Sequence, residues 1–366
     1  MGGAEQMLLK LTAHMDRKRF HSVVVSMTDV GPVGEKLLEQ DIPVYALGMR
    51  LGRPNPFGLV KLLRLLKTEN PDLIQTWLYH ADLLGFIAGK MAGIRRIVWG
   101  LRCSNMELKN YRFLTSLTIK VCRWLSFFVD AIVVNSREGA LFHKQLGYSK
   151  KKMILIPNGF DLDHFKPDEE ARHWLRNELS LPSEATLIGL IARFDPMKDQ
   201  ANFLEAASLV FCPEGKVFFV MVGKGIDAAN QDLLALIPEK IKKHVYLLGL
   251  RHDIPRITAG LDIAISSSAY GEGFPNTIGE AMACGIPCVA TDVGDSSFIL
   301  GPTGIIVPPR DAAALAAGLR TLLALGKTGR QRQGKQARIR VRQRYELGRI
   351  VNQFENFYRQ IISDSR

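Results

Sequence analysis

The sequence lacks the cysteine patterns of a disulfide scaffold or a zinc site. Its five cysteines form neither a CxxC pair nor a Cys/His spacing typical of zinc binding: Cys103, Cys122, Cys212, Cys284 and Cys288. An odd, scattered set of this kind indicates free thiols in a reducing compartment. We therefore expect neither a disulfide framework nor a bound metal.

The sequence also lacks a long apolar run. Its most apolar stretch, around Cys122, is interrupted by Arg123 and Asp130, and it falls short of the roughly 18–20 residues that a membrane-spanning helix needs. The N-terminal segment lacks the basic start, apolar core and cleavage site of a signal peptide. These absences predict a cytoplasmic protein.

Acidic residues are the scarcer charge, with 36 Asp and Glu against 48 Lys and Arg, which gives a formal net charge of +12. A surplus of this size favours an anionic partner, such as nucleotide phosphates, nucleic acid or a membrane surface. The sequence contains no helix-turn-helix, RNP or zinc pattern, so nucleic acid is the weakest of these three readings.

Short apolar strands alternate with helix-length segments along the 366 residues, which predicts an α/β fold with doubly wound sheets. Several strands are apolar at consecutive positions, as in a parallel sheet buried on both faces. The expected strands are 21–27, 73–77, 96–100, 131–135, 153–156, 187–193, 217–222, 244–248, 262–266, 286–290 and 304–307.

The alternation breaks once, between Pro157 and Pro182, where an Asn-Gly turn and a polar, proline-flanked stretch indicate a linker. We predict two Rossmann-like domains, over 1–170 and 171–345. A C-terminal helix over about 346–366 is expected to pack back on the first domain.

The N-terminus departs from the usual Rossmann order. Gly2, Gly3 and Glu5 stand where a glycine turn is expected, but no opening strand precedes them. The first strand of the N-terminal domain is therefore expected to be missing. Either the protein starts upstream, which we favour, or the domain folds with a gap.

The most informative segment runs from Tyr270 to Ala290 and reads as strand end, glycine-rich loop, helix, glycine stop and strand. Glycines in the loop allow the backbone to approach a ligand closely. The helix that follows offers backbone N–H groups and a positive dipole end, which together suit a diphosphate. Glu272 in the loop and Glu280 in the helix can accept hydrogen bonds from hydroxyl groups of a sugar and a ribose.

A pair of cations follows an earlier expected strand, in the segment from Ile191 to Asp199. Arg193 and Lys198 could stabilise the negative charge that develops when a sugar leaves its diphosphate. Two cations and a helix dipole can do so without a metal.

The Glu272-x7-Glu280 block with Gly-Phe-Pro-Asn between resembles the signature of glycosyltransferase family 4. Further segments resemble that family in the same order along nearly the whole chain. The resemblance implies the GT-B fold, in which two Rossmann-like domains face each other across a cleft. It also implies transfer of a sugar from a nucleotide diphosphate donor, such as a UDP-sugar, with retention of anomeric configuration.

The resemblance assigns roles to individual residues. Glu272 and His80 would act at the sugar, and Gly2, Gly3 and Glu5 would form a loop at the cleft. The donor would be held by Arg193, Lys198, Gly223, Gly225, Arg251, Gly273, Phe274, Pro275, Asn276, Thr277 and Glu280. No metal or other cofactor is expected.

The acceptor side of the sequence is basic and aromatic. Between residues 90 and 123 eight cations accompany the single acid Glu107, with aromatic residues interleaved: Lys90, Arg95, Arg96, Arg102, Lys109, Arg112, Lys120 and Arg123. This composition suits an anionic membrane and a glycan or lipid-linked acceptor, as in polysaccharide or lipopolysaccharide biosynthesis. We expect the protein at the inner face of the plasma membrane. A solvated basic helix face would give the same pattern.

Two other functions fit the same fold. A nucleotide-sugar epimerase would change the donor without an acceptor, and a catalytically impaired relative would bind a nucleotide sugar without transferring it. A dinucleotide oxidoreductase is disfavoured, because neither Gly2-Gly3 nor Gly223-x-Gly225 continues as GxGxxG.

Overall fold

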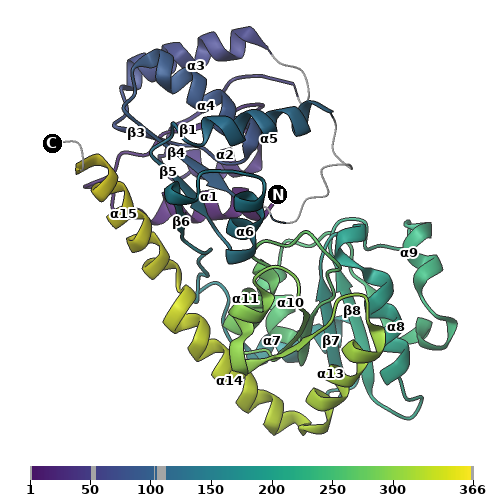
Figure 1. Cartoon of the computed structure of the whole chain (residues 1–366). Coiled ribbons are helices and arrows are strands. Elements are labelled where there is room, and N and C mark those ends of the chain that lie inside the picture. Colours follow the sequence, from purple (N-terminus) through teal and green to yellow (C-terminus); the bar gives the residue numbers. More distant parts are fainter. Residues whose placement is uncertain (1, 51–54, 103, 105–112, 364–366) are drawn as a thin grey trace. The chain divides into compact units, whose positions relative to one another are not determined.

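The computed structural model describes residues 2–50, 55–102, 104 and 113–363, and they fall into two compact units (Figure 1). The first comprises Met1–Gly159 with Leu347–Arg366, and the second comprises Phe160–Glu346. The division lies before the expected boundary at residue 170. Phe160 stacks on Phe274 and contacts the edge of Tyr345, so the chain enters the core of the second unit at once.

The first unit contains two parallel sheets of four strands and two strands. Its elements are α1 (Gly3–His14), β1 (Val24–Ser26), α2 (Gly31–Leu38), β2 (Val44–Ala46), α3 (Pro56–Glu69), β3 (Leu73–Gln75), α4 (Tyr79–Ala92), β4 (Arg96–Leu101), α5 (Phe113–Leu125), β5 (Ala131–Val134), α6 (Arg137–Gln145), η2 (Lys150–Lys152), β6 (Met153–Leu155) and α15 (Leu347–Ser363). The order is β3-β4-β5-β6 in one sheet and β1-β2 in the other.

The split sheet matches the expected missing strand. In a Rossmann order of 3-2-1-4-5-6, the pair β2-β1 takes positions 3 and 2, and β3 takes position 4. Among the described residues no strand takes position 1, and the chain passes directly into α1. Strand β2 was not predicted, because it directly follows Pro43 and none of its side chains is fully buried.

Alternating side chains divide the first unit into layers on the two faces of its larger sheet. Val98, Ala131 and Val133 face a core shared with α1 and α15. Ile97, Trp99 and their neighbours on β5 face the opposite core, which α4 and α5 cover (Figure 1). Strands buried on both faces explain why β4 and β5 are apolar at consecutive positions.

The second unit is a complete doubly wound sheet. Its elements are α7 (Glu169–Glu178), β7 (Thr186–Ile191), η3 (Pro196–Lys198), α8 (Gln200–Val210), β8 (Val217–Val222), α9 (Gln231–Leu236), η4 (Glu239–His244), β9 (Val245–Leu247), α10 (Ile254–Gly260), β10 (Ile263–Ser266), α11 (Asn276–Ala283), β11 (Cys288–Thr291), α12 (Ser296–Leu300), η5 (Gly301–Thr303), β12 (Ile305–Val307), α13 (Ala312–Ala324) and α14 (Gly326–Tyr345).

The six parallel strands of this sheet follow the order β12-β11-β10-β7-β8-β9. This is the 3-2-1-4-5-6 order read from its other end, with β7 first and β10 fourth. The order reverses between β7 and β10, and ligands of such sheets bind at the carboxyl ends of the strands beside that point. One face packs against α7, α10, α11 and α14, and the other against α8 and α13.

No helix within the described ranges is both long and apolar enough to cross a membrane. The described cysteines are free thiols, and Cys122, Cys284 and Cys288 are buried. Cys103 lies outside the described residues.

Candidate functional site

The glycine-rich loop and the cation segment meet at the switch point of the second unit. The loop over 267–275 leaves β10, and the segment over 192–199 leaves β7, the adjacent strand. Lys198 Nζ forms an ion pair with the Glu272 carboxylate. The structure therefore brings together two residues that lie 74 positions apart in the sequence.

Further hydrogen bonds fix these two segments to each other. The Ser268 hydroxyl donates to Glu272 Oε1 at 2.7 Å, and the Ser267 hydroxyl donates to the Lys198 carbonyl at 2.8 Å. The backbone N–H of Ala269 donates to the Met197 carbonyl at 2.9 Å. Glu272 is 8% exposed, so a carboxylate and an ammonium group are held in a defined position at the edge of the sheet.

The loop approaches the start of α11 through glycines and a proline. Gly271 has φ +77°, a conformation that favours glycine. Pro275 is the N-cap residue of α11, and Asn276 and Thr277 are half-buried in its first turn. The N–H groups of a first helical turn point out of the helix end, where they can meet an anion.

Phe274 lies in the core instead of lining the loop surface. It is 7% exposed and packs between Phe160 and Tyr345, with ring centroids 6.0 and 5.6 Å away. Its side chain anchors the loop, and only its backbone can meet a ligand. Glu280 is half-buried on α11.

Arg193 follows β7 and remains largely exposed. Its side chain is 54% exposed and pairs with Asp195 at 2.8 Å. Gln200 donates a hydrogen bond to the Arg193 carbonyl at 2.8 Å, which ties this position to the start of α8. Arg193 and Lys198 both follow β7, and Lys198 is the one that forms an ion pair with Glu272.

Gly223 and Gly225 form the turn after β8. A Cβ atom on Gly223 would lie 2.1 Å from the Ala192 carbonyl oxygen, so only glycine allows β8 to approach the segment after β7 this closely. The Gly223 N–H donates to the Gly249 carbonyl at 2.8 Å. The ends of β7, β8 and β9 thus converge beside the loop.

Arg251 is engaged with protein carboxylates. It pairs with Glu178 at 2.8 Å and Asp253 at 2.6 Å, and these hydrogen bonds raise its pKa. Trp174 lies beneath the guanidinium, with its centroid 5.9 Å away. This arrangement gives Arg251 a structural role, and its contact with a donor stays a prediction.

The residues expected at the other side of a cleft belong to the first unit. Gly2 donates its backbone N–H to Glu5 Oε2 at 2.8 Å, so the Glu5 carboxylate caps α1. Gly3 is the first residue of α1. His80 is exposed in the first turn of α4. That these residues face the donor stays a prediction.

Two buried titratable groups support the start of α4. Tyr79 donates its hydroxyl to His143 Nε2 at 2.6 Å, while Nδ1 lies 2.7 Å from the Gly139 carbonyl, and burial lowers the His143 pKa to about 4. Thr76 donates to Asp82 at 2.5 Å, and burial raises the Asp82 pKa to about 8. Asp82 is therefore mostly protonated at neutral pH.

Three site residues were missed by the sequence reasoning. Ser268 bonds to Glu272, and Asp295 donates its N–H to the Gly273 carbonyl at 2.9 Å. Gly294, with φ +60°, lies so close that a Cβ there would be 2.5 Å from the Glu272 carbonyl oxygen. Gly294 and Asp295 follow β11, the neighbour of β10. Their place at a strand end was the available signal.

Arg102 is a half-buried cation at the carboxyl end of β4 in the first unit. Its guanidinium lies 4.0 Å from the Trp77 ring centroid and donates to Asn158 Oδ1 at 2.8 Å. Nε and Nη2 are buried, and neither has a hydrogen-bond partner. Burial lowers the pKa of Arg102 to about 9. The sequence included Arg102 only as one basic residue among many.

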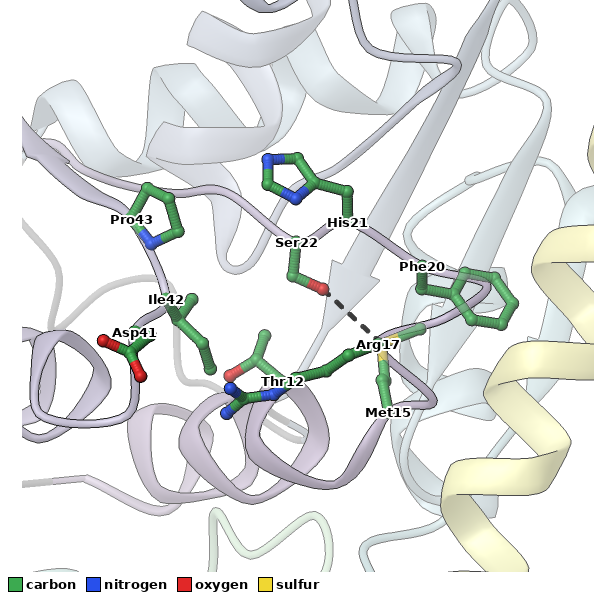
Figure 2. Close-up of a pocket in the computed structure, with 9 residues that line it drawn as sticks. All are labelled: Thr12, Met15, Arg17, Phe20, His21, Ser22, Asp41, Ile42 and Pro43. Atoms are coloured by element: carbon green, nitrogen blue, oxygen red, sulfur yellow. Dashed lines mark hydrogen bonds between the residues drawn. The ribbon is translucent and has the colours of Figure 1, made fainter.

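A small pocket in the first unit lies between the end of α1 and the starts of β1 and β2 (Figure 2). It is lined by Thr12, Met15, Arg17, Phe20, His21, Ser22, Asp41, Ile42 and Pro43. Because it opens at the amino ends of these strands, it lies at the edge opposite to that used for ligands in such sheets. No group of His, Cys, Asp or Glu side chains in the described parts of the chain could hold a metal ion.

Two Rossmann-like units, the second carrying a cation beside a glycine-rich turn at its switch point, define a GT-B protein. Two family models match the chain: "Glycosyltransferase Family 4" over residues 1–164 and "Glycosyl transferases group 1" over residues 185–325. The chain belongs to the glycosyltransferases built from these two domains.

Two similar curated proteins are named as sugar transferases. One is an Escherichia coli UDP-Gal:alpha-D-GlcNAc-diphosphoundecaprenol alpha-1,3-galactosyltransferase, 27% identical over 66% of this chain and 63% of its own length. Another is a Campylobacter jejuni N,N'-diacetylbacillosaminyl-diphospho-undecaprenol alpha-1,3-N-acetylgalactosaminyltransferase, 27% identical over 77% of this chain and 75% of its own length.

Among solved structures, Anabaena Alr3699/HepE in complex with UDP-glucose superimposes with a TM-score of 0.82. The two chains are 24% identical, and the match covers 98% of this chain and 96% of the other. At this identity the likeness supports the fold.

Proposed function

We propose that the protein transfers a sugar from a UDP-sugar to a glycan or lipid-linked acceptor in cell-surface polysaccharide or lipopolysaccharide biosynthesis, with retention of anomeric configuration. The relatives that act on diphosphoundecaprenol-linked sugars support this choice of donor and acceptor. The names of these relatives favour transfer over the epimerase reading.

The ion pair between Lys198 and Glu272, beside the start of α11, carries the proposal. A donor diphosphate at this point would meet Lys198, the guanidinium of Arg193 and the backbone N–H groups of the turn from Gly273 to Thr277. These positive groups lie where charge develops as the diphosphate leaves, which lowers the energy of the transition state. They are also preorganised, because Glu272 and the Ser267 hydroxyl already hold Lys198 in place.

The carboxylates would bind hydroxyl groups. Glu272, in the loop, would accept hydrogen bonds from the donor sugar. Glu280, within α11, would accept them from the ribose. His80 would contact the sugar from the first unit. We propose no nucleophile on the protein: the leaving phosphate helps take the proton of the acceptor, while the enzyme supplies position and charge.

We further propose that transfer requires no metal. Lys198, Arg193 and the positive end of α11 supply the charge that a divalent cation supplies in other nucleotide-sugar enzymes. Transfer in the presence of excess EDTA should proceed at the untreated rate, and a loss of rate that Mg²⁺ or Mn²⁺ restores would contradict this part of the proposal.

The basic first unit supports an anionic acceptor at the inner face of the plasma membrane. Arg102 lies beside Trp77 at the carboxyl end of the sheet with its Nε and Nη2 buried, and no carboxylate of the described residues pairs with it. A buried cation without an opposite charge is costly, and the diphosphate of a lipid-linked acceptor would offset that cost.

The test begins with calorimetry using UDP and with a screen of UDP-hexoses for transfer to a diphosphate-linked lipid acceptor. The double variant Arg193→Ala/Lys198→Ala should lose transfer and UDP binding while it keeps the melting temperature of the wild type. Lys216→Ala/Lys242→Ala is the matched control, because it removes two cations from exposed ion pairs. Wild-type transfer by the first variant would overturn the proposal, and conversion of donor alone would identify an epimerase.

A further inference from the structure

Helix α5 in the first unit exposes the wrong residues for a helix that faces water. Its buried inward side chains are Thr118, Ile119 and Cys122, and Ser126 is buried just after the helix end. Its outward side chains recur every three or four residues, and most of them are large and apolar: Leu114, Leu117, Val121 and Trp124. Phe127 and Phe128, which directly follow the helix, are exposed as well.

The outward side chains are well exposed. Trp124 is 68% exposed and Phe128 is 66% exposed. An isolated exposed apolar residue is ordinary, but a contiguous stripe of this kind marks an interaction surface. Helix α4 packs beside α5 (Figure 1). Ile87 and Met91 of α4 are 39% and 62% exposed.

The exposed charges on and beside these two helices are mostly positive, and Asp130, which follows the stripe, is paired with Arg96. Lys90, Arg95, Lys120 and Arg123 are exposed on or beside α4 and α5. From residue 83 to residue 129 the only acid in the sequence is Glu107, which lies outside the described residues. Arg123 lies 5.4 Å from the Trp124 ring centroid, a pairing that suits the boundary between lipid headgroups and acyl chains.

We propose that α5 and the adjacent turn of α4 form a membrane-docking surface, defined by Leu114, Leu117, Val121, Trp124, Phe128 and Met91, that lies in the plane of an anionic bilayer. The apolar side chains enter the headgroup boundary while the cations contact anionic headgroups. The occupant is a lipid surface and not a protein, because an apolar stripe with exposed cations on and beside its helices matches the layers of an anionic leaflet. The inference deepens the proposed function, since it brings the first unit to where a lipid-linked acceptor resides.

The test is sedimentation of the full chain with two kinds of vesicle, pure phosphatidylcholine and phosphatidylcholine with about a third phosphatidylglycerol. The wild type should bind the anionic vesicles preferentially and release them at high salt. Trp124→Ser/Phe128→Ser should bind them at least about tenfold more weakly, because two aromatic side chains no longer enter the bilayer. Leu209→Ser/Ile339→Ser is the matched control, with side chains 44% and 46% exposed on the second unit.

A second measurement places the helix directly. Tryptophan fluorescence should be quenched by brominated lipid in the wild type, and Trp124→Phe should lose most of that quenching, because Trp99 is buried and the other tryptophans lie outside α5. Equal vesicle binding by wild type and the serine double variant, or quenching that survives in Trp124→Phe, would overturn the inference. So would a wild-type dimer that the same variant dissociates, because α5 would then be covered by a second copy.

The outcome is separable from that of the proposed function. Transfer to a water-soluble acceptor analogue should be equal in the wild type and the serine double variant, while transfer to acceptor embedded in vesicles should fall with vesicle binding. Vesicle binding that depends on α5, without transfer to any acceptor, would sustain the docking surface and remove the proposed function. Transfer without vesicle binding would sustain the proposed function and remove the docking surface.

Discussion

Gly294→Ala should damage the donor site specifically, although Gly294 itself bears no side chain that could bind a ligand. Gly294 has φ +60°, and a Cβ there would lie 2.5 Å from the Glu272 carbonyl oxygen and 2.7 Å from that of Gly273. Both are backbone atoms of the loop that holds Glu272, so they cannot rotate away as a flexible side chain would. The loop must shift, and the bond from the Asp295 N–H to the Gly273 carbonyl must lengthen.

The size of the effect follows from these distances. Ordinary contacts between carbon and oxygen are about 3.3 Å or longer, so the loop must move by roughly 0.8 Å at the Glu272 carbonyl. A displacement approaching 1 Å in an active site lowers the rate by up to about a hundredfold. We expect kcat/KM to fall about 10- to 100-fold, which is about 1.4–2.7 kcal/mol of transition-state stabilisation, and UDP affinity to fall with it.

Gly326→Ala separates this effect from backbone strain. Gly326 has φ +63°, close to that of Gly294, but nothing lies within 4 Å of a Cβ built there. Both variants should therefore lose about 1–2 kcal/mol of folding free energy from the left-handed conformation, seen as a lower melting temperature. Only Gly294→Ala should also lose transfer and UDP binding. Wild-type kcat/KM in Gly294→Ala, with the melting temperature lowered as in Gly326→Ala, would refute the assignment of the loop as the donor site.

Three further predictions concern single side chains. Lys198→Met should lose UDP affinity at least about tenfold in calorimetry, whereas Lys216→Met should leave it unchanged; equal affinities would remove Lys198 from the donor site. Because the Asp82 pKa is raised to about 8, the free energy of unfolding falls progressively as pH rises from about 4 to 8. Asp82→Asn should therefore gain stability over the wild type at pH 8, up to about 5 kcal/mol, but not at pH 4, as measured by urea unfolding. The His143 pKa is lowered to about 4. The contribution of the neutral imidazole to the free energy of unfolding is therefore complete above pH 6.5 and is lost as pH falls towards 4. The wild type should lose up to about 3 kcal/mol over that range, and His143→Gln should show a flatter profile; parallel profiles would contradict the role of this buried imidazole.

Much of the fold could be predicted because strands buried on both faces have a local signature. Every strand of the second sheet coincides with an apolar run expected from the sequence, and the strand over Val217–Val222 was predicted to the residue. Strand β2 could not be predicted in this way, since it directly follows Pro43 and none of its side chains is fully buried, with Tyr45 exposed. The expected boundary at residue 170 was wrong by one short segment, because Phe160 is anchored by Phe274 and Tyr345, which are far away in the sequence.

The sequence indicated the residue types of the candidate donor site, whose contact with a donor stays a prediction. The order of the glycines, the cation pair and the two glutamates along the chain indicates a site for a nucleotide diphosphate sugar. Their individual tasks were less visible. Phe274 is a core anchor, Arg251 is neutralised by Glu178 and Asp253, and Glu5 caps its own helix. A residue's partners depend on segments that meet only after folding, and the sequence does not list them.

The sequence by itself therefore determined the class of fold, the place of the glycine-rich turn and the chemical character of the residues around it, because periodicity, glycine and charge are local properties. Only the tertiary structure decided that Lys198 meets Glu272, that Gly294 supports the loop and that α5 turns its apolar side outward. Each of these depends on which strands are neighbours and which face of a helix the core covers. The packing of the whole unit fixes those relations, and no single segment contains them.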